Sequence, residues 1–285
     1  MRWTPGGESQ DIEDRRDDGG GGGGGGLGGR GVGIGGLLVL GLLSLVFRQD
    51  LISPFLGSGG NTVSGPAANP AQTASEKKEV EFVSFVLDDV QKTWAALLPA
   101  SGAAYRKTTL VLFRDVTQSA CGSAQSATGP FYCPGDEKVY LDLGFYDELK
   151  SKFGAPGEFA QAYVLAHEIG HHVQNILGIE AKVRRSQEAN PRARNALSVR
   201  TELQADCLAG VWGNTARQQN LIDPRDVESG LAAAASVGDD RIARMAGAQA
   251  SPERFTHGSS QQRVSWFRRG MEQGKVEACD TFSQQ

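Results

Sequence analysis

Apolar residues recur with helical spacing in residues 76–98, where they form a stripe along one side of a predicted helix. The stripe consists of Val80, Phe82, Val83, Val86, Leu87, Val90, Trp94 and Leu97. Two short runs later in the chain are β-branched or alternate between apolar and polar residues. These runs, Thr108–Phe113 and Val139–Leu143, predict two strands.

From Gly157 onward the pattern is helical almost throughout. Near the end of the chain, Ser259 is followed three residues later by Gln262, which resembles a capping box and predicts a last helix through Phe267. Strands therefore come early and helices late. We expect an α+β fold that is predominantly helical, with a small β-sheet early in the domain.

The first residues follow another pattern. Residues 1–18 are mostly polar and on balance acidic, and residues 19–26 are an unbroken run of glycine. Such a segment buries too little apolar surface to offset the entropy of ordering it. We therefore predict a disordered, acidic and Gly-rich tail over residues 1–30.

Residues 31–47 are uncharged and rich in leucine and glycine. A helix of this length would be about 26 Å long, close to the hydrocarbon thickness of about 30 Å. A buried core helix is disfavoured because a tail precedes the run and a linker follows it. A cleaved signal peptide is disfavoured because its n-region would be long and acidic, with no A-x-A-like site nearby. We predict one transmembrane span at residues 31–52, with the lipid bilayer as a partner.

The positive-inside rule gives the orientation of this span. Arg15, Arg16 and Arg30 precede it, whereas Arg48 is the only basic residue among the twenty that follow residue 47. The prediction is a single-pass protein of the inner or cytoplasmic membrane with a cytoplasmic N-terminus. Residues 53–75 are rich in Gly, Ser, Pro and Ala and predict a flexible linker. The domain at residues 76–285 would then be periplasmic or extracellular.

The net charge and the cysteine count add two predictions, one about partners and one about disulfides. The 285 residues include 29 basic and 33 acidic side chains, so the formal net charge is −4 and no nucleic-acid partner is expected. The four cysteines, an even number outside a membrane, predict disulfides. Three connectivities exist, and the pairs Cys121–Cys133 and Cys207–Cys279 are the most economical. The alternatives are four buried thiols or a zinc cluster, although no C-x-x-C pair is present to nucleate one.

The informative motif lies in the helical segment 160–177, where residues 167–171 read His-Glu-Ile-Gly-His. Histidines at i and i+4 share one helix face, so His167 and His171 can bind the same Zn²⁺, one per chain. Glu168 can take a proton from a water at that ion and return it to the leaving amine. The alternative is a pair of structural histidines on an exposed helix. His172 points away and is expected to be a polar neighbour rather than a ligand.

A catalytic zinc site takes a third protein ligand. Glu202 and Asp206 are also spaced i and i+4, among apolar residues that argue against two solvated surface charges. They look like the E-x-x-x-D arrangement of gluzincin peptidases, in which the Glu binds zinc and the Asp orients a ligand histidine. His257 lies just before the predicted capping box. It is a candidate for stabilising an oxyanion, and equally an ordinary loop residue.

These motifs, with several others, resemble the bacterial family of neutral zinc metallopeptidases with one N-terminal membrane span. The resemblance runs nearly end to end and is carried by residues 1–3, 13–16, 121–134, 166–174, 202–212 and 255–263. It implies a zincin-like metallopeptidase domain of the gluzincin type. It also implies His167, His171 and Glu202 as zinc ligands and Glu168 as the catalytic residue.

Three functions are compatible with these residues. The first is a membrane-anchored zinc endopeptidase that hydrolyses peptide or protein substrates, with a strand such as Val139–Leu143 holding an extended substrate by β-pairing. The second is a zinc hydrolase that acts on a non-protein amide, for example in the cell wall. The third is a non-catalytic, membrane-tethered binding module with a zincin fold. The intact Glu168 speaks against the third function, because a non-catalytic protein does not need to keep a general base.

Overall fold

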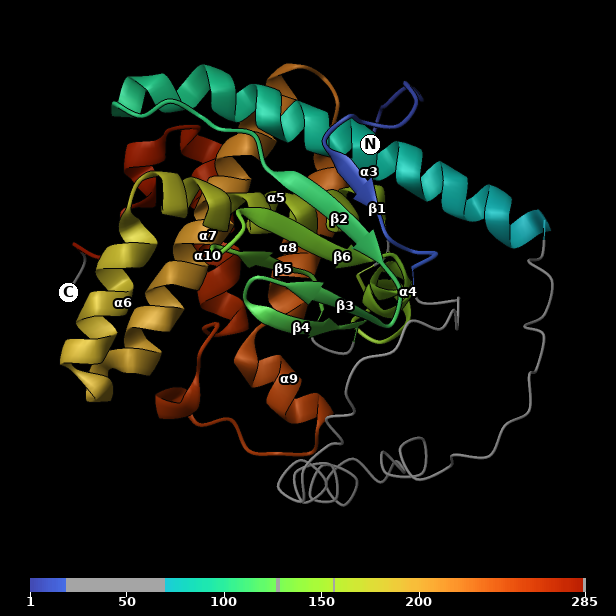
Figure 1. Ribbon diagram of the computed structural model, residues 1–285. Coiled ribbons are helices and arrows are strands. Elements are labelled where there is room, and N and C mark those ends of the chain that lie inside the picture. Colours follow the sequence, from blue (N-terminus) through green and yellow to red (C-terminus); the bar gives the residue numbers. More distant parts are fainter. Residues whose placement is uncertain (19–69, 127–128, 156, 284–285) are drawn as a thin grey trace, which may run out of the picture. The chain divides into compact units, whose positions relative to one another are not determined.

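Four short strands form a mixed sheet in the order β1-β2-β6-β5 (Figure 1). They are β1 (Ile12–Asp14), β2 (Thr109–Phe113), β6 (Lys138–Asp142) and β5 (Phe131–Cys133). β1, β2 and β6 run parallel, whereas β5 runs antiparallel to β6. A separate antiparallel hairpin consists of β3 (Val116–Ser119) and β4 (Gly122–Gln125). The computed structural model describes residues 1–18, 70–126, 129–155 and 157–283.

The two faces of the sheet are covered differently, because side chains alternate along each strand. Leu110 and Leu112 of β2 belong to the main core, which they share with the helices. Val111 and Phe113, which alternate with them, form a smaller cluster that includes Ala124 of the hairpin. The predicted strands at 108–113 and 139–143 are therefore confirmed to within a residue at each end. The sequence did not predict β1, β3, β4 or β5.

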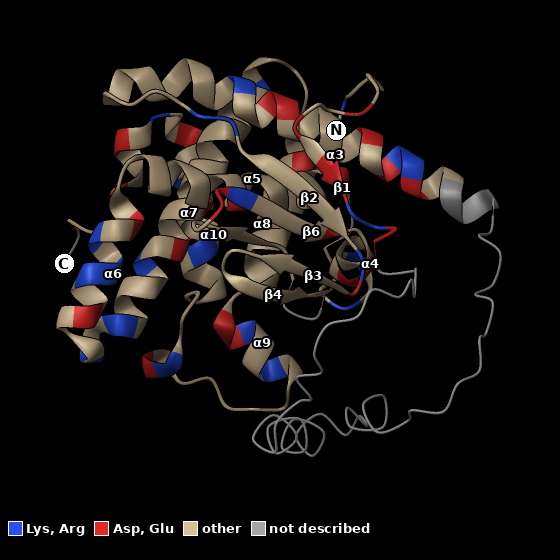
Figure 2. Cartoon of the chain, in the orientation of Figure 1, with Lys and Arg blue, Asp and Glu red and all other residues tan. Residues whose placement is uncertain are grey.

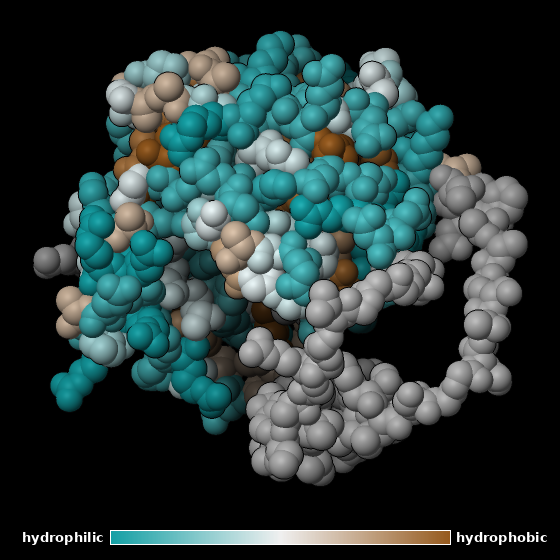
Figure 3. All heavy atoms as spheres, in the orientation of Figure 1, coloured by the Kyte–Doolittle hydropathy of each residue, from teal (hydrophilic) through white to brown (hydrophobic). Residues whose placement is uncertain are grey.

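Helices make up most of the described chain. In chain order they are α3 (Pro70–Leu97), α4 (Gly144–Ser151), α5 (Glu158–Ile176), α6 (Ile179–Ala189), α7 (Arg194–Gln218), α8 (Pro224–Ser236), α9 (Asp239–Met245) and α10 (Ser260–Gln273). The predominantly helical α+β class is confirmed. So are the apolar stripe of α3, apart from the partly buried Leu97, and the capping box formed by Ser259 and Gln262. The face in Figure 3 is mainly hydrophilic, with apolar side chains in small groups.

α5 is the central helix, and fourteen of its residues are buried. It contacts α6, α7 and α8 as well as strands β5 and β6. The helix is therefore packed on several sides, which fixes the direction of every side chain that it presents. This packing positions the motif at residues 167–171.

Residues 1–18 differ from the sequence prediction of a disordered tail. Residues 12–14 form β1, whose register pairs Ile12 with Leu110 and Asp14 with Leu112. These residues belong to the same compact unit as residues 73–285. The prediction is wrong for residues 1–18 because backbone pairing with β2 and ion pairs with the domain offset the polarity of the segment.

The other N-terminal predictions fall largely on residues that the structure does not describe. The predicted span at 31–52 lies outside them, as does most of the predicted linker at 53–75. Residues 70–75 of that linker are helical, since α3 begins at Pro70. Among the described residues, no helix is both long enough and apolar enough to cross a bilayer.

Candidate metal centre

The first feature of the site is the close approach of α5 and α7. A Cβ atom added at Gly170 would lie 3.0 Å from the carbonyl oxygen of Ala205, so the absence of a side chain there lets the two helices meet. Gly170 belongs to the motif on α5, and Ala205 lies between Glu202 and Asp206 on α7. The helix contact therefore brings both i, i+4 pairs of the sequence to one place.

Three of the predicted residues converge at this contact. His167, His171 and Glu202 each offer one ligand atom, and these atoms all lie within 4.8 Å of one another. Glu202 Oε2 lies 3.2 Å from His167 Nε2, and Glu202 Oε1 lies 3.5 Å from His171 Nε2. Two ligands of a tetrahedral Zn²⁺ at 2.0–2.1 Å are about 3.4 Å apart. The donor set and its spacing therefore fit zinc.

The opposite ring nitrogen of each histidine is held by an oxygen. His167 Nδ1 lies 3.0 Å from Asp206 Oδ1, as the sequence predicts. His171 Nδ1 lies 2.8 Å from Gln174 Oε1, and the Gln174 amide in turn donates to Thr201 O and Gln204 Oε1. With an N–H at each Nδ1 donating to these oxygens, each Nε2 would be left free to bind a metal ion.

Asp206 is itself anchored by two buried side chains. Arg263 of α10 donates to it from Nε at 2.8 Å and from Nη2 at 2.9 Å, and the Tyr163 hydroxyl also donates to it. Asp206 is 0% exposed and Arg263 is 3% exposed. Burial alone would raise the pKa of Asp206, but the charges of Arg263 and His167 and the hydrogen bonds with them together outweigh burial and lower it. Asp206 therefore stays ionised beside His167.

The pKa values of the two glutamates of the site, Glu168 and Glu202, are shifted in opposite directions. Burial raises the pKa of Glu168 to about 7, above its ordinary value. Burial also disfavours the charged form of Glu202, but the charges of His171 and His167 and a hydrogen bond with His167 outweigh it and lower the Glu202 pKa. A carboxyl poised near neutrality suits proton transfer, whereas a permanently ionised carboxylate suits a metal ligand.

These residues open onto one cavity of about 620 Å³, which His167, Glu168, His171, Glu202 and Arg263 all line. β5, the edge strand beside β6, supplies Phe131 and Tyr132 to its wall. The strand predicted at 139–143 cannot pair with a substrate, because β6 lies between β2 and β5. The sequence did not reveal the strand order, so it pointed to the wrong strand.

His257 also lines this cavity, but the structure does not bring it into the three-residue cluster. Its Nδ1 lies 3.2 Å from Asp239 Oδ1, and the side chain is half exposed. Asp239 Oδ2 accepts backbone N–H groups of Thr256, His257 and Gly258, which fixes the loop. The role of His257 as an oxyanion stabiliser stays a prediction.

His172 lies on another side of α5, as the sequence predicts, and is fully buried. Its Nε2 lies 2.7 Å from the carbonyl oxygen of Arg106, and its Nδ1 lies 2.9 Å from the Tyr132 hydroxyl. Asn175 also donates to that hydroxyl, at 3.0 Å. His172 and Asn175 therefore fix α5 against the edge strand.

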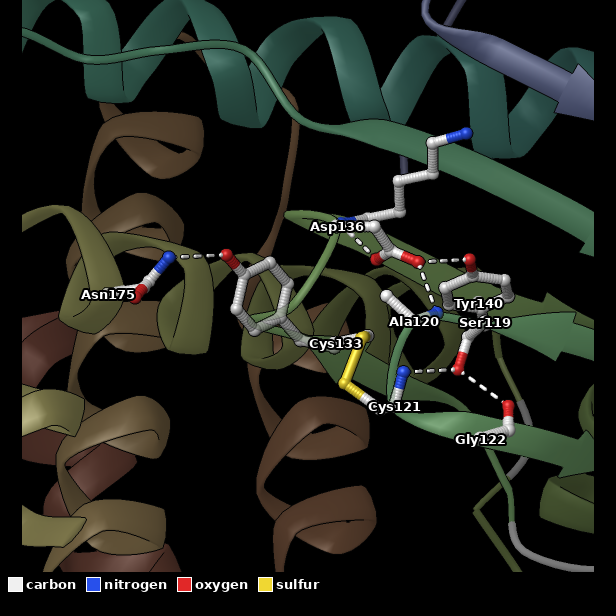
Figure 4. Close-up of a disulfide and its surroundings, with 10 residues drawn as sticks. Ser119, Ala120, Cys121, Gly122, Cys133, Asp136, Tyr140 and Asn175 are labelled. Atoms are coloured by element: carbon white, nitrogen blue, oxygen red, sulfur yellow. Dashed lines mark hydrogen bonds between the residues drawn. A yellow bond between two sulfur atoms is a disulfide. The ribbon is translucent and has the colours of Figure 1, made fainter.

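Both predicted disulfides are confirmed. Cys121 and Cys133 join the turn of the β3–β4 hairpin to the end of β5 (Figure 4). Close to this bond, Asp136 accepts from the Tyr140 hydroxyl and from the backbone N–H of Ala120 (Figure 4). Cys207 and Cys279 join α7 to the C-terminal 3-10 turn at Val276–Cys279. Cys207 directly follows Asp206, so the second bond fixes α7 beside the candidate ligands.

Sequence reasoning missed Arg263, Tyr163 and Gln174. Gln174 and Tyr163 carry a local signal, because they lie three and four residues from His171 and His167 on the same helix. Arg263 carries a weaker signal, as the last residue of the segment 255–263. Its partner Asp206 lies 57 residues earlier on another helix, and helix spacing cannot show that distant contact.

The chain is similar to known bacterial proteins along most of its length. Over 289 residues the chain is 44% identical to the uncharacterized protein YpfJ of Escherichia coli K12, covering 99% of each chain. It is 42% identical over 207 residues to the uncharacterized protein Rv2575 of Mycobacterium tuberculosis H37Rv, covering 69% of this chain and 68% of that protein. No solved structure matches. Residues 1–282 match the family model described as "Putative neutral zinc metallopeptidase", and the chain therefore belongs to that family.

Proposed function

We propose that the protein is a zinc-dependent peptidase that binds one zinc ion per chain through His167, His171 and Glu202. The observation that carries the proposal is the convergence of these three ligand atoms in the cavity that Glu168 also lines. Asp206 and Gln174 orient the two histidines from behind. These contacts provide the ligand set and the support that a catalytic zinc site requires.

Zinc held by these residues supplies a Lewis acid that polarises a scissile carbonyl and acidifies water. Glu168 is the general base and then the general acid. It takes a proton from the attacking water and later delivers it to the leaving nitrogen, so the carboxylate is regenerated at the end of the cycle. Its pKa of about 7 lets it do both near neutral pH. Asp206, held ionised by Arg263, keeps His167 in the tautomer that offers Nε2 to the metal.

The edge strand favours a peptide over a non-protein amide. Tyr132 of β5 makes a backbone hydrogen bond that lowers the Glu168 pKa slightly, which places the strand against the general base. Within the described chain β5 pairs with β6 on one side only. An extended peptide can pair with its other side and lie across the metal site. A substrate without an extended peptide backbone cannot form this pairing.

The experiment compares the two glutamates on the same preparations. Glu202→Ala removes a proposed ligand and should lower zinc content well below one per chain. Glu168→Gln should keep zinc near one per chain and slow peptide hydrolysis by roughly 10²–10⁴-fold. Glu188→Gln, at an exposed position on α6, is the matched control and should resemble wild type. Full zinc and full activity in Glu202→Ala would refute the ligand assignment.

We also propose that the folded domain resides outside the cytoplasm. Two disulfides, between cysteines 12 and 72 residues apart, favour an oxidising compartment. Alkylation of protein taken from its native compartment, followed by mass mapping, tests this. Four reactive thiols would contradict it. Attachment through residues 31–52 stays a prediction of the sequence, tested by fractionation with membranes.

A further inference from the structure

The cavity at the metal centre has two arms. The larger cavity, about 620 Å³, extends from the cluster toward β5, α4 and α9. A second cavity of about 420 Å³ extends along α6 and α7 and is lined by Arg184, Gln187 and Ser198. Thr201, Glu202 and Glu180 line both cavities. The two cavities therefore meet at the metal centre and flank it.

The two arms differ in their aromatic lining. Phe145 and Phe153 line the larger arm, with ring centroids 6.3 Å apart. Phe131 also lines it, although its ring stacks on Tyr140. Ile242 of α9 completes this wall and is 42% exposed, unusually open for an isoleucine in the described chain. Among the described residues, the arm along α6 has no aromatic side chain in its lining, which combines Arg184 and Gln187 with the small apolar residues Ala181 and Val183. An exposed apolar surface beside a reaction site indicates that an apolar part of the substrate covers it on binding.

We infer that the larger arm is a specificity subsite for a bulky apolar side chain, such as that of leucine or phenylalanine, on one side of the scissile bond. The arm along α6 accepts a polar side chain on the other side. This inference rests on the proposed peptidase function and names its substrate class. The apolar wall and the β5 edge border the same cavity, so one peptide can use both.

Ile242 provides the test because it has a matched control on the same helix. Met245 lies three residues later on α9, is 51% exposed, and is not among the residues that line the cavity. Full-length, zinc-loaded Glu168→Gln protein is titrated with fluorescent peptides in which one position at a time is varied. One position should prefer Leu or Phe over Ala by roughly tenfold or more. Ile242→Lys should abolish that preference, whereas Met245→Lys should preserve it.

The outcomes separate this inference from the proposed function. Wild-type protein that cleaves peptides without any apolar preference overturns the subsite and leaves the peptidase intact. An apolar preference in binding without any cleavage by wild type overturns the peptidase and leaves the subsite. Equal effects of Ile242→Lys and Met245→Lys, or the absence of peptide binding, also overturn the subsite.

A second inference comes from residues 1–18, independently of the site. The backbone N–H of Arg15 donates to Leu112 O at 2.7 Å, and that of Leu110 donates to Asp11 O at 2.8 Å. Glu13 pairs with Lys138 at 2.6 Å, and the Trp3 ring packs on Phe82 at 5.4 Å. Figure 2 shows charges of both signs along this segment. Residues 1–18, which include the motif at residues 13–16, therefore bind to the domain, and we call this segment the N-terminal clasp.

We infer that residues 1–18 lie on the same side of any membrane as the domain. A strand cannot pair with β2 across a bilayer, so the register of β1 with β2 requires both strands to be in one compartment. Residues 1–18 then share the compartment in which the disulfides form, which differs from the cytoplasmic N-terminus that the sequence predicts.

Cysteine labelling tests this inference. Asp17→Cys and Met245→Cys place one thiol at an exposed position of each segment in the full chain. A membrane-impermeant maleimide, applied to cells with a permeabilised outer membrane, should label both positions to the same extent. Hydrogen exchange of purified protein should show protected amides at residues 12–15. Labelling of position 245 without position 17, or fast exchange at these amides, would overturn it.

Discussion

Removing the positive charge of Arg263 should destabilise the protein far more than removing a surface arginine. Arg263 and Asp206 are almost completely buried and share two hydrogen bonds of 2.8 and 2.9 Å. Arg263→Met keeps the volume but leaves a buried carboxylate without its counter-charge, which costs about 3–5 kcal/mol. At roughly 2–4 °C per kcal/mol for a domain of this size, Tm should fall by about 6–20 °C.

The control is Arg244→Met, because the Arg244–Asp240 pair is exposed and should contribute at most about 1 kcal/mol. Unfolding is followed by heat and by urea on metal-free protein, since bound zinc would itself raise Tm. The double variant Asp206→Leu with Arg263→Met should be less destabilised than the sum of its singles. Additive losses, or a Tm within about 2 °C of wild type for Arg263→Met, would refute the reasoning.

Three further predictions follow from named contacts. Burial lowers the pKa of His172, so the unfolded chain binds a proton that the folded chain does not, and stability should fall as pH drops below about 6.5. His172→Gln should flatten that slope in urea titrations, and an unchanged slope would contradict the assignment. Replacing Cys207 and Cys279 by alanine opens a 72-residue loop and should cost about 4 kcal/mol, measured by urea unfolding under oxidising conditions; unchanged stability would contradict it. A hydrogen bond from Lys138 lowers the pKa of Glu13, so the stability this pair contributes is complete above about pH 4.5 and is lost as pH falls through the lower folded value. Protection of residues 12–15, corrected for intrinsic exchange rates, should decrease below about pH 4, and constant protection would speak against the clasp.

Local spacing made much of the metal centre predictable. Both halves of the site are i, i+4 pairs, and such pairs share a helix face whatever the tertiary structure. His167 with His171, and Glu202 with Asp206, could therefore be found from the sequence alone. The contact between the two helices could not, although Gly170 inside the motif is the residue that permits it. The sequence predicted the donors, and the close helix packing brings them together.

The features that the sequence failed to predict, β1 and Arg263, share a different cause. β1 has three residues, and its flanks are so polar that composition indicates disorder. Its stability comes from partners about a hundred residues away, such as Leu110 and Lys138, which no local pattern reveals. Arg263 was missed for the same reason. From sequence alone, a charged residue is expected at the surface unless its buried partner is known. That partner can be identified only in the folded chain.

The strand order links the two inferences. A sheet of four strands has two edges, and here β1 occupies one and β5 the other. β1 carries Glu13 and Asp14 on a very short strand, features that discourage further pairing at that edge. β5 ends in Cys133, whose disulfide fixes it beside the hairpin, while its residues Phe131 and Tyr132 line the cavity that holds Glu168. β1 therefore occupies one edge of the sheet with a strand that discourages further pairing. The other edge, at β5 beside the general base, is left for an extended substrate.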